Sequence, residues 1–553
     1  MSDIAIGIAS FPILLGLIFL RMPIGLAMFV VAIGGLISLD GDLTSTLGRL
    51  KSETYTTFSN YSFSIVPMFL LMGHFATLGG MSKALFKAAE GWLGHRKGGV
   101  AMAAVGSCAG FGAICGSSLA TAATMSRVAL PELKRYGYSG GFSTATLAAG
   151  GTLGILIPPS VVLVIYAILA EQNIEKLFIA AVIPGILAAL GYVLVISIYV
   201  RLFPDSAGIR APVPYAERFR ALFDVWPVLL VFALVVGGIY LGWFSPTEGA
   251  AVGALGTGII ALANRGLNIR TLGESFIVTA RSTAMIFFII LGAFLYNGFL
   301  ARTQLPQELA NWVGAAPLSP WVVLALILVF YLIMGCVMDS LSMILLTIPI
   351  FWPLVQELDF NFVSMVDLHA AKLDVALAEA QALWDGLRSG AIGGLDAEDF
   401  AETLAEVNAH MQTLGLGSVA EAGNLNLAQI TAAVNETTPE MVDQARAAVA
   451  AGAEIERDVL RELGIRGVSE GALNRINMER VAIWFGILVL IVVEVGLITP
   501  PVGMNLFVIN AMDPSTRMLD TYRSVLPFVA SDLIRVTILV LIPAITLFLI
   551  PLF

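Results

Sequence analysis

Two stretches of this sequence share one pattern, Leu153-Gly154-Ile155-Leu156-Ile157-Pro158-Pro159 and Val495-Gly496-Leu497-Ile498-Thr499-Pro500-Pro501. Proline has no backbone N–H and blocks the helix beside it. Both stretches lie in apolar runs, so each predicts a helix broken at membrane depth, with backbone carbonyls released from the helix. A plain proline kink is the simpler interpretation of one such break. The matching pair favours two equivalent sites.

The composition indicates a membrane protein built from α-helices. Of 553 residues, 58% are hydrophobic and 13% are charged, and the mean hydropathy is +0.88. A soluble domain of this length needs a larger charged surface. A bilayer span needs about 20 apolar residues, and ten segments approach that length. These expected spans are 4–20, 23–39, 62–80, 142–170, 177–202, 225–243, 247–264, 276–300, 480–511 and 525–550.

Two further apolar segments, 98–131 and 320–357, are interrupted halfway by small or polar residues. The interruptions are Cys115-Gly116-Ser117-Ser118 in the first segment and Met338-Asp339-Ser340 in the second. Each half is too short to cross a bilayer. We therefore predict two re-entrant helical hairpins whose tips line a cavity inside the protein, where exposed backbone is tolerated.

The order of these elements repeats along the chain as three spans, a hairpin and two spans. Five crossings are an odd number, so the second copy starts on the opposite side of the membrane and the repeat is inverted. From Pro131 to Pro158 is 27 positions, whereas from Pro353 to Pro500 is 147. The excess corresponds to one insertion after Phe360.

This comparison predicts five parts. They are a first membrane repeat at 1–203, with hairpin 98–131 and broken helix 142–170; a cytoplasmic linker at 204–224; the start of the second repeat at 225–360, with hairpin 320–357; a soluble insertion at 361–476; and the rest of the second repeat at 477–553, with broken helix 480–511. The helical insertion carries 18 acidic and 7 basic residues. A solvated excursion and a surface that docks a partner both remain open for it.

The basic residues outside the insertion indicate the orientation. With the open end of the first hairpin in the cytoplasm, fifteen Lys and Arg residues lie on the cytoplasmic side and five on the other. Cytoplasmic loops carry such an excess. Both termini and the insertion are then expected outside, in the periplasm of a bacterium with two membranes.

Polar residues near the breaks and tips are the candidates for substrate binding, because polar groups inside a membrane face a pathway or pair with one another. They are Ser117, Ser118, Thr152, Asp339, Ser340 and Asn505. For Glu494 an ion-linked role and a buried carboxylic acid are equally open. Asp532 and Arg535, three residues apart, are interpreted as an intrahelical pair.

Several motifs resemble the large membrane (M, or DctM-type) subunit of tripartite ATP-independent periplasmic (TRAP) transporters. The matching motifs are Gly112–Ala122, Lys134–Tyr138, Leu153–Ser160, Pro184-Gly185, Pro246–Glu248 and Thr499–Gly503. The resemblance implies a sodium symporter of the elevator type in the bacterial inner membrane. It also implies a small Q (DctQ-type) membrane subunit, a periplasmic P (DctP-type) binding protein and an organic acid anion as substrate.

The resemblance further implies two sodium sites made largely of backbone carbonyls. The first would use Gly112, Cys115, Gly154, Ile157 and Pro158, and the second Gly335, Gly496, Thr499 and Pro500. Cys115 stands where the family usually has serine. Because the expected ligand is the backbone carbonyl of this residue, the change of side chain need not abolish the site.

Three other functions are compatible with a helical membrane protein of this kind. A self-sufficient divalent-anion/sodium symporter of the same architecture would need no binding protein. An intramembrane enzyme is disfavoured because no histidine falls in a hairpin and no nucleophile–base pair or metal-ligand set is evident. A passive channel is disfavoured because hairpins paired with broken helices enclose a bound substrate. No cofactor other than sodium is expected.

Overall fold

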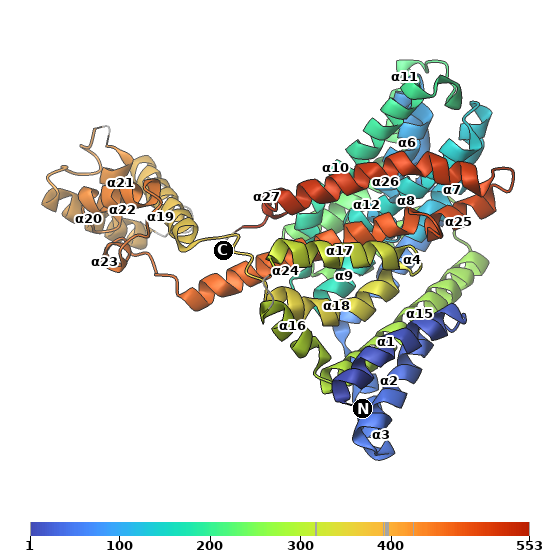
Figure 1. Ribbon diagram of the computed structural model, residues 1–553. Helices are drawn as coiled ribbons and strands as arrows, with labels where there is room; N and C mark the ends of the chain where they lie inside the picture. The colour runs from blue at the N-terminus through green and yellow to red at the C-terminus, as the bar shows by residue number, and fades with distance from the viewer. Residues whose placement is uncertain (1, 316–317, 391, 393–396, 424, 552–553) are drawn as a thin grey trace. The chain divides into compact units, whose positions relative to one another are not determined.

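The computed structural model describes residues 2–315, 318–390, 392, 397–423 and 425–551, and all regular structure among these residues is helical (Figure 1). The chain divides into two compact units. Unit 1 comprises Met1–Asp359 and Ala482–Ile550, and unit 2 comprises Phe360–Val481 and Pro551–Phe553.

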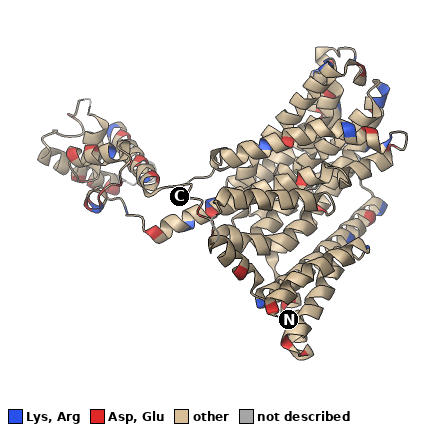
Figure 2. Ribbon diagram, in the orientation of Figure 1, with Lys and Arg blue, Asp and Glu red and all other residues tan. Residues whose placement is uncertain are grey.

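Unit 1 contains most of the apolar helices. In the described part of the chain, seven helical segments are long and apolar enough to cross a membrane, or eight with one bent pair. The seven are Tyr61–Leu78, Ile174–Leu202, Tyr215–Tyr240, Pro246–Ala263, Ile269–Arg302, Glu470–Ile498 and Met518–Leu541. Figure 2 shows that charged residues are sparse along these helices and are found largely near their ends. The prediction of an all-helical polytopic membrane protein is therefore confirmed.

The helices of unit 1 outside the hairpins and broken helices have the following bounds. They are α1 (Asp3–Phe19), α2 (Ile24–Asp40), α3 (Leu43–Ser59), η1 (Tyr61–Ser64), α4 (Ile65–Leu78), α5 (Met81–Leu93), α10 (Ile174–Leu202), η2 (Pro204–Ser206), α11 (Tyr215–Phe223), α12 (Trp226–Phe232), η3 (Ala233–Gly237), α13 (Gly238–Tyr240), α14 (Pro246–Ala263), α15 (Ile269–Arg302), α16 (Leu305–Ala315), α26 (Met518–Leu541) and α27 (Ala544–Leu547).

Two pairs of helices occupy the segments expected to be hairpins. They are α6 (Gly99–Cys115) with α7 (Ser118–Arg135), and α17 (Pro320–Gly335) with α18 (Ser340–Gln356). Gly116 ends α6 in a left-handed conformation with φ of 63°, which glycine adopts without steric cost. Ser117 and Asp339 are the N-caps of α7 and α18. At both tips, therefore, the second helix of the hairpin begins after a residue whose polar side chain caps it.

Each Pro-Pro pair separates two helices. Pro158-Pro159 lies between α8 (Gly140–Leu156) and α9 (Val161–Leu169), which are bent by 46°. Pro500-Pro501 lies between α24 (Glu470–Ile498) and α25 (Met504–Met512), and both Pro-Pro peptide bonds are cis. Residues 141–156 of α8 and 481–498 of α24 are buried on every side. The broken helices thus form the interior of unit 1, as helices that are apolar all round do.

Unit 2 is a small helical domain with its own core. Its helices are α19 (Met365–Ser389), α20 (Ala397–Thr413), α21 (Leu427–Val434), α22 (Pro439–Ala450) and α23 (Arg457–Glu462), followed by the start of α24. Two clusters of buried apolar residues hold them together. The side-chain amide of Asn477 bonds to both the N–H and the C=O of Val363, each at 2.9 Å, and so joins the two ends of the unit.

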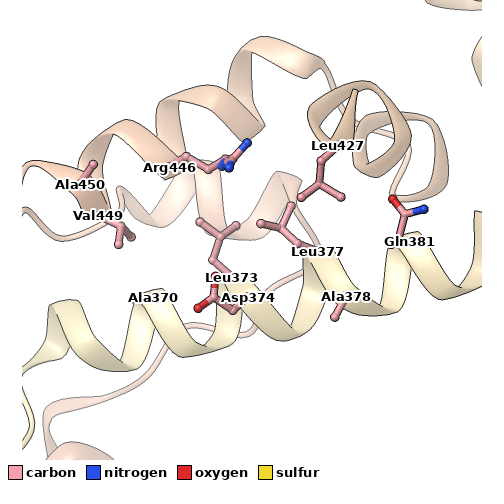
Figure 3. Close-up of a pocket in the computed structure, with 10 residues that line it drawn as sticks. All are labelled: Ala370, Leu373, Asp374, Leu377, Ala378, Gln381, Leu427, Arg446, Val449 and Ala450. Atoms are coloured by element: carbon pink, nitrogen blue, oxygen red, sulfur yellow. The ribbon is translucent and has the colours of Figure 1, made fainter. Parts of the chain in front are cut away.

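An apolar groove of about 640 Å³ lies among α19, α21 and α22. Figure 3 shows that Leu373 and Leu377 point from α19 into this groove, with Leu427 facing them. Asp374 and Arg446 supply its charged groups. The insertion therefore has a concave surface of its own in addition to a packed core.

We expect residues 360–481 to fold as an independent helical domain, because their core is built from residues of this unit. Val442→Asp places a charge at a position that is 0% exposed, and should lower the free energy of unfolding by about 3 kcal/mol or more. Urea denaturation followed by circular dichroism measures the change. The control is Val375→Asp, at a position 51% exposed, which should change stability by about 0.5 kcal/mol or less. Equal effects of the two substitutions would contradict an independent core.

Candidate functional site

The tip of the first hairpin packs directly against the first broken helix. A Cβ atom on Gly112 would lie only 2.4 Å from the Cα of Gly154, and one on Gly154 would lie 2.8 Å from the carbonyl oxygen of Ser117. Real side chains do not approach so closely, so both positions require glycine. At the tip itself, a Cβ on Gly116 would lie 3.1 Å from the carbonyl oxygen of Pro159. The hairpin backbone therefore rests on the backbone of the break.

The second hairpin makes the same kind of contact with the second broken helix. A Cβ on Gly496 would lie 2.6 Å from the Cα of Gly335. The N–H of Gly503, past the break, donates to the carbonyl oxygen of Cys336 at 3.4 Å. Two glycine pairs, one in each half, thus bring a hairpin tip and a proline break together.

The prolines of each break leave backbone carbonyl oxygens without their usual helical N–H donors. Proline lacks an N–H, so Pro158 gives no i→i−4 bond to the carbonyl of Gly154, and Pro500 gives none to that of Gly496. The N–H of Thr499 turns back to Gly496 at 3.0 Å, and its hydroxyl donates to Val495 at 2.6 Å. The oxygens near each break are carbonyls and hydroxyls, which suit a hard cation of low charge.

The predicted sodium ligands lie in these two contact regions. Gly112 and Cys115 come from the first hairpin, and Gly154, Ile157 and Pro158 from its broken helix; Gly335, Gly496, Thr499 and Pro500 flank the second contact. Among the described residues no group of three or more His, Cys, Asp or Glu side chains is placed to hold a metal ion.

Five of the six candidate substrate residues lie at the hairpin tips or next to the second break. Ser117, Ser118, Asp339 and Ser340 lie at the two tips. Asp339 also has a structural task there, since its carboxylate accepts from the N–H of Ser342 at 3.0 Å and from its hydroxyl at 2.6 Å. Asn505 lies at the start of α25 and is fully buried, and its amide O and N have no hydrogen-bond partner in the described part of the chain.

Thr152 lies elsewhere, in a buried polar chain that sequence reasoning missed. Its hydroxyl donates to Ala149 at 2.7 Å and lies 2.9 Å from the hydroxyl of Tyr192. Tyr192 donates to Asp532 at 2.7 Å, and Asp532 lies 2.9 Å from Arg535. The intrahelical pair of Asp532 and Arg535 is thereby confirmed. The sequence signal for this polar chain was Tyr192, a tyrosine in the apolar run of α10.

A second missed contact joins the base of the first hairpin to the loop after α25. Lys134, at the end of α7, donates to the carboxylate of Asp513. Burial by itself raises the pKa of Asp513, but the hydrogen bonds from Lys134, Ser515 and Thr516 outweigh it and lower the pKa below the usual value. The carboxylate therefore stays charged and maintains its ion pair with Lys134 at the base of the first hairpin.

The family model described as "Tripartite ATP-independent periplasmic transporter, DctM component" matches residues 11–369 and 459–545. The chain is 35% identical to the C4-dicarboxylate TRAP transporter large permease protein DctM of Pseudomonas aeruginosa, over 62% of this chain and 81% of that protein. It is 30% identical to the sialic acid TRAP transporter large permease protein SiaM of Vibrio cholerae, over 63% of this chain and 80% of that protein.

Among solved structures, the chain is similar to the YdaH transporter of Alcanivorax borkumensis, with 14% sequence identity and a TM-score of 0.49 over 90% of this chain and 88% of that one. A likeness at this level supports no inference about function. The family match leaves out residues 370–458, which belong to unit 2.

We expect Gly112→Ala to destabilise the protein, because its new Cβ meets the backbone of Gly154 at 2.4 Å. Overpacking of this kind costs about 1–3 kcal/mol. The matched control is Gly106→Ala on the same helix, where a Cβ meets nothing within 4 Å; it should leave stability unchanged or raise it by about 0.5–1 kcal/mol. Thermal unfolding of the purified protein in detergent compares the two. Equal midpoints would refute the close approach of the hairpin to the break.

Proposed function

The chain belongs to the DctM family of TRAP transporter large permeases, and we propose that it imports a small organic acid anion together with sodium ions by an elevator mechanism. Membership of this family of transporters excludes the hypothesis of an intramembrane enzyme. The observation that carries the proposal is the pair of equivalent contacts in which a hairpin tip rests on a proline break through two glycines.

The same pair of contacts supports an inverted repeat. Ser118 lies 13 positions before Pro131, and Ser340 lies 13 positions before Pro353. Both serines open the second helix of their hairpin, next to an N-cap that accepts from the N–H three residues on. Matching offsets, caps and glycine contacts in two halves are the expected marks of a duplicated unit that binds its ligands between the copies.

In this proposal each contact binds one sodium ion as a co-substrate. The first site uses carbonyls of Gly112, Cys115, Gly154, Ile157 and Pro158. The second uses Gly335, Gly496, Pro500 and Thr499, and Thr499 adds a hydroxyl. Sodium bound by backbone oxygens would lock each hairpin tip onto its broken helix, because the ion is shared by both. Binding of the ions would therefore shape the space between the tips before the substrate is carried across.

The substrate in this proposal lies between the two tips. α7 and α18 begin at Ser118 and Ser340, and helix N-termini carry partial positive charge that favours anions. Ser117, Ser118, Ser340 and Asn505 would supply hydrogen bonds to a carboxylate. Relatives are described as transporters of C4-dicarboxylates and of sialic acid, both of them acids. An organic acid anion is therefore the proposed class.

Membership of the TRAP family implies two protein partners, a small membrane subunit and a periplasmic substrate-binding protein. We assign the termini and the insertion to the periplasmic side of the inner membrane, because basic residues outside the insertion are concentrated on the opposite side. Unit 2 would then share a side of the membrane with the binding protein.

We expect the purified complex in liposomes to accumulate a C4-dicarboxylate such as succinate only when an inward sodium gradient and the loaded binding protein are both present. The binding protein delivers the substrate, and the sodium gradient supplies the free energy for accumulation. Uptake of radiolabelled substrate measures the result, with equal sodium on both sides as the control. Accumulation without the binding protein would favour a self-sufficient symporter.

Replacing Thr499 by valine keeps its shape and removes the hydroxyl of the proposed second site. We expect about a three- to tenfold rise in the sodium concentration for half-maximal uptake, the effect of losing one hydrogen-bonding group of about 1 kcal/mol. Thr537→Val is the matched control, because both threonine hydroxyls donate to the carbonyl four residues earlier, and Thr537 is exposed on α26. An unchanged sodium requirement in Thr499→Val would remove Thr499 from the site.

A further inference from the structure

Glu494 is a buried carboxyl group close to the second break. It belongs to α24, six residues before Pro500, and is 1% exposed. Carboxyl groups inside a membrane protein are costly unless they are paired. We therefore expect the surrounding residues to provide hydrogen-bond donors to this carboxyl group.

Those partners come from both hairpins. The hydroxyl of Ser118 donates to Oε1 of Glu494 at 3.4 Å, and Ser340 lies close enough to the same carboxyl group to interact with it. Ser118 is the first residue of α7, and Ser340 is the first residue of α18. One carboxyl group thus lies beside the equivalent residue at each of the two tips.

The charges nearby favour this arrangement. Two helices of 18 and 17 residues begin at the contacting serines, and their N-termini attract negative charge. The neighbouring carboxylate of Asp532 has its own partners in Arg535 and Tyr192. Within the described residues, Oε2 of Glu494 has no hydrogen-bond partner. The side chain is therefore anchored at Oε1 by Ser118.

We propose that Glu494 is a positioning residue that fixes the two hairpin tips relative to each other and so makes the two sodium sites bind cooperatively. The inference rests on the proposed function, in which each tip closes one sodium site. When sodium draws one tip onto its broken helix, the shared carboxyl group favours the bound position of the other. Coupling between two sites in proteins is typically about 5- to 150-fold in affinity.

Three variants test this role in the assembled complex with its binding protein. Glu494→Leu removes the interactions with both serines, whereas Glu494→Gln keeps a side-chain oxygen that accepts from Ser118. Glu217→Leu, at an exposed glutamate of α11, controls for the chemical change. The readouts are the Hill coefficient of sodium-dependent uptake and the number of sodium ions moved per substrate. The sodium dependence of the thermal unfolding midpoint, measured in detergent, reports cooperativity even in a variant that does not transport.

For the wild type and Glu217→Leu we expect a Hill coefficient approaching two, the number of proposed sites. Glu494→Leu should lower it toward one and raise the half-maximal sodium concentration about tenfold, and Glu494→Gln should restore most of the cooperativity. Unchanged cooperativity in Glu494→Leu would overturn the proposal. So would a loss of one transported ion in Glu494→Gln, because Glu494 would then bind a cation itself. Uptake by the wild-type complex that does not depend on sodium would instead contradict the proposed function on which the inference depends.

Discussion

Backbone hydrogen bonding in a medium without water is the constraint on which this structure depends. Each N–H and C=O at membrane depth needs a partner within the protein, and a pair of adjacent prolines withdraws two donors at once. The chain accepts this loss twice, after Ile157 and after Thr499. Both places are enclosed by protein, since α8 and the apolar part of α24 are buried on every side. The oxygens near each break are consequently kept away from lipid.

The hairpins complete these enclosures because their tips are small. Gly112 and Gly335 let one backbone approach another at distances that a methyl group would prevent. The polar caps at Ser117 and Asp339 start the returning helices without exposing their first N–H groups. A side chain at either contact would separate the two backbones and leave the oxygens of the break facing a gap. The fold of unit 1 and the chemistry of the site therefore have the same origin.

Much of this arrangement follows from local sequence. The proline pairs locate the breaks, the interruptions at Ser117 and Asp339 locate the tips, and the acidic composition marks the insertion. The contacts that depend on distant segments do not follow. Glu494 and Ser118 are 376 positions apart, and Thr152 turns to Tyr192 rather than to the tips. Side-chain direction in helices buried on all sides is set by neighbours, and hydrophobic periodicity gives no preferred face for such helices.

The two bonds between Asn477 and Val363 have a consequence for how this chain can vary. Because residues near the entrance and exit of unit 2 are bonded to each other, the chain leaves the unit close to where it enters it. A domain whose two ends lie close together is readily tolerated as an insertion within another domain. The family match, which skips residues 370–458, is consistent with such a graft. Natural chains of this kind could gain, lose or exchange the module while the membrane host kept its geometry.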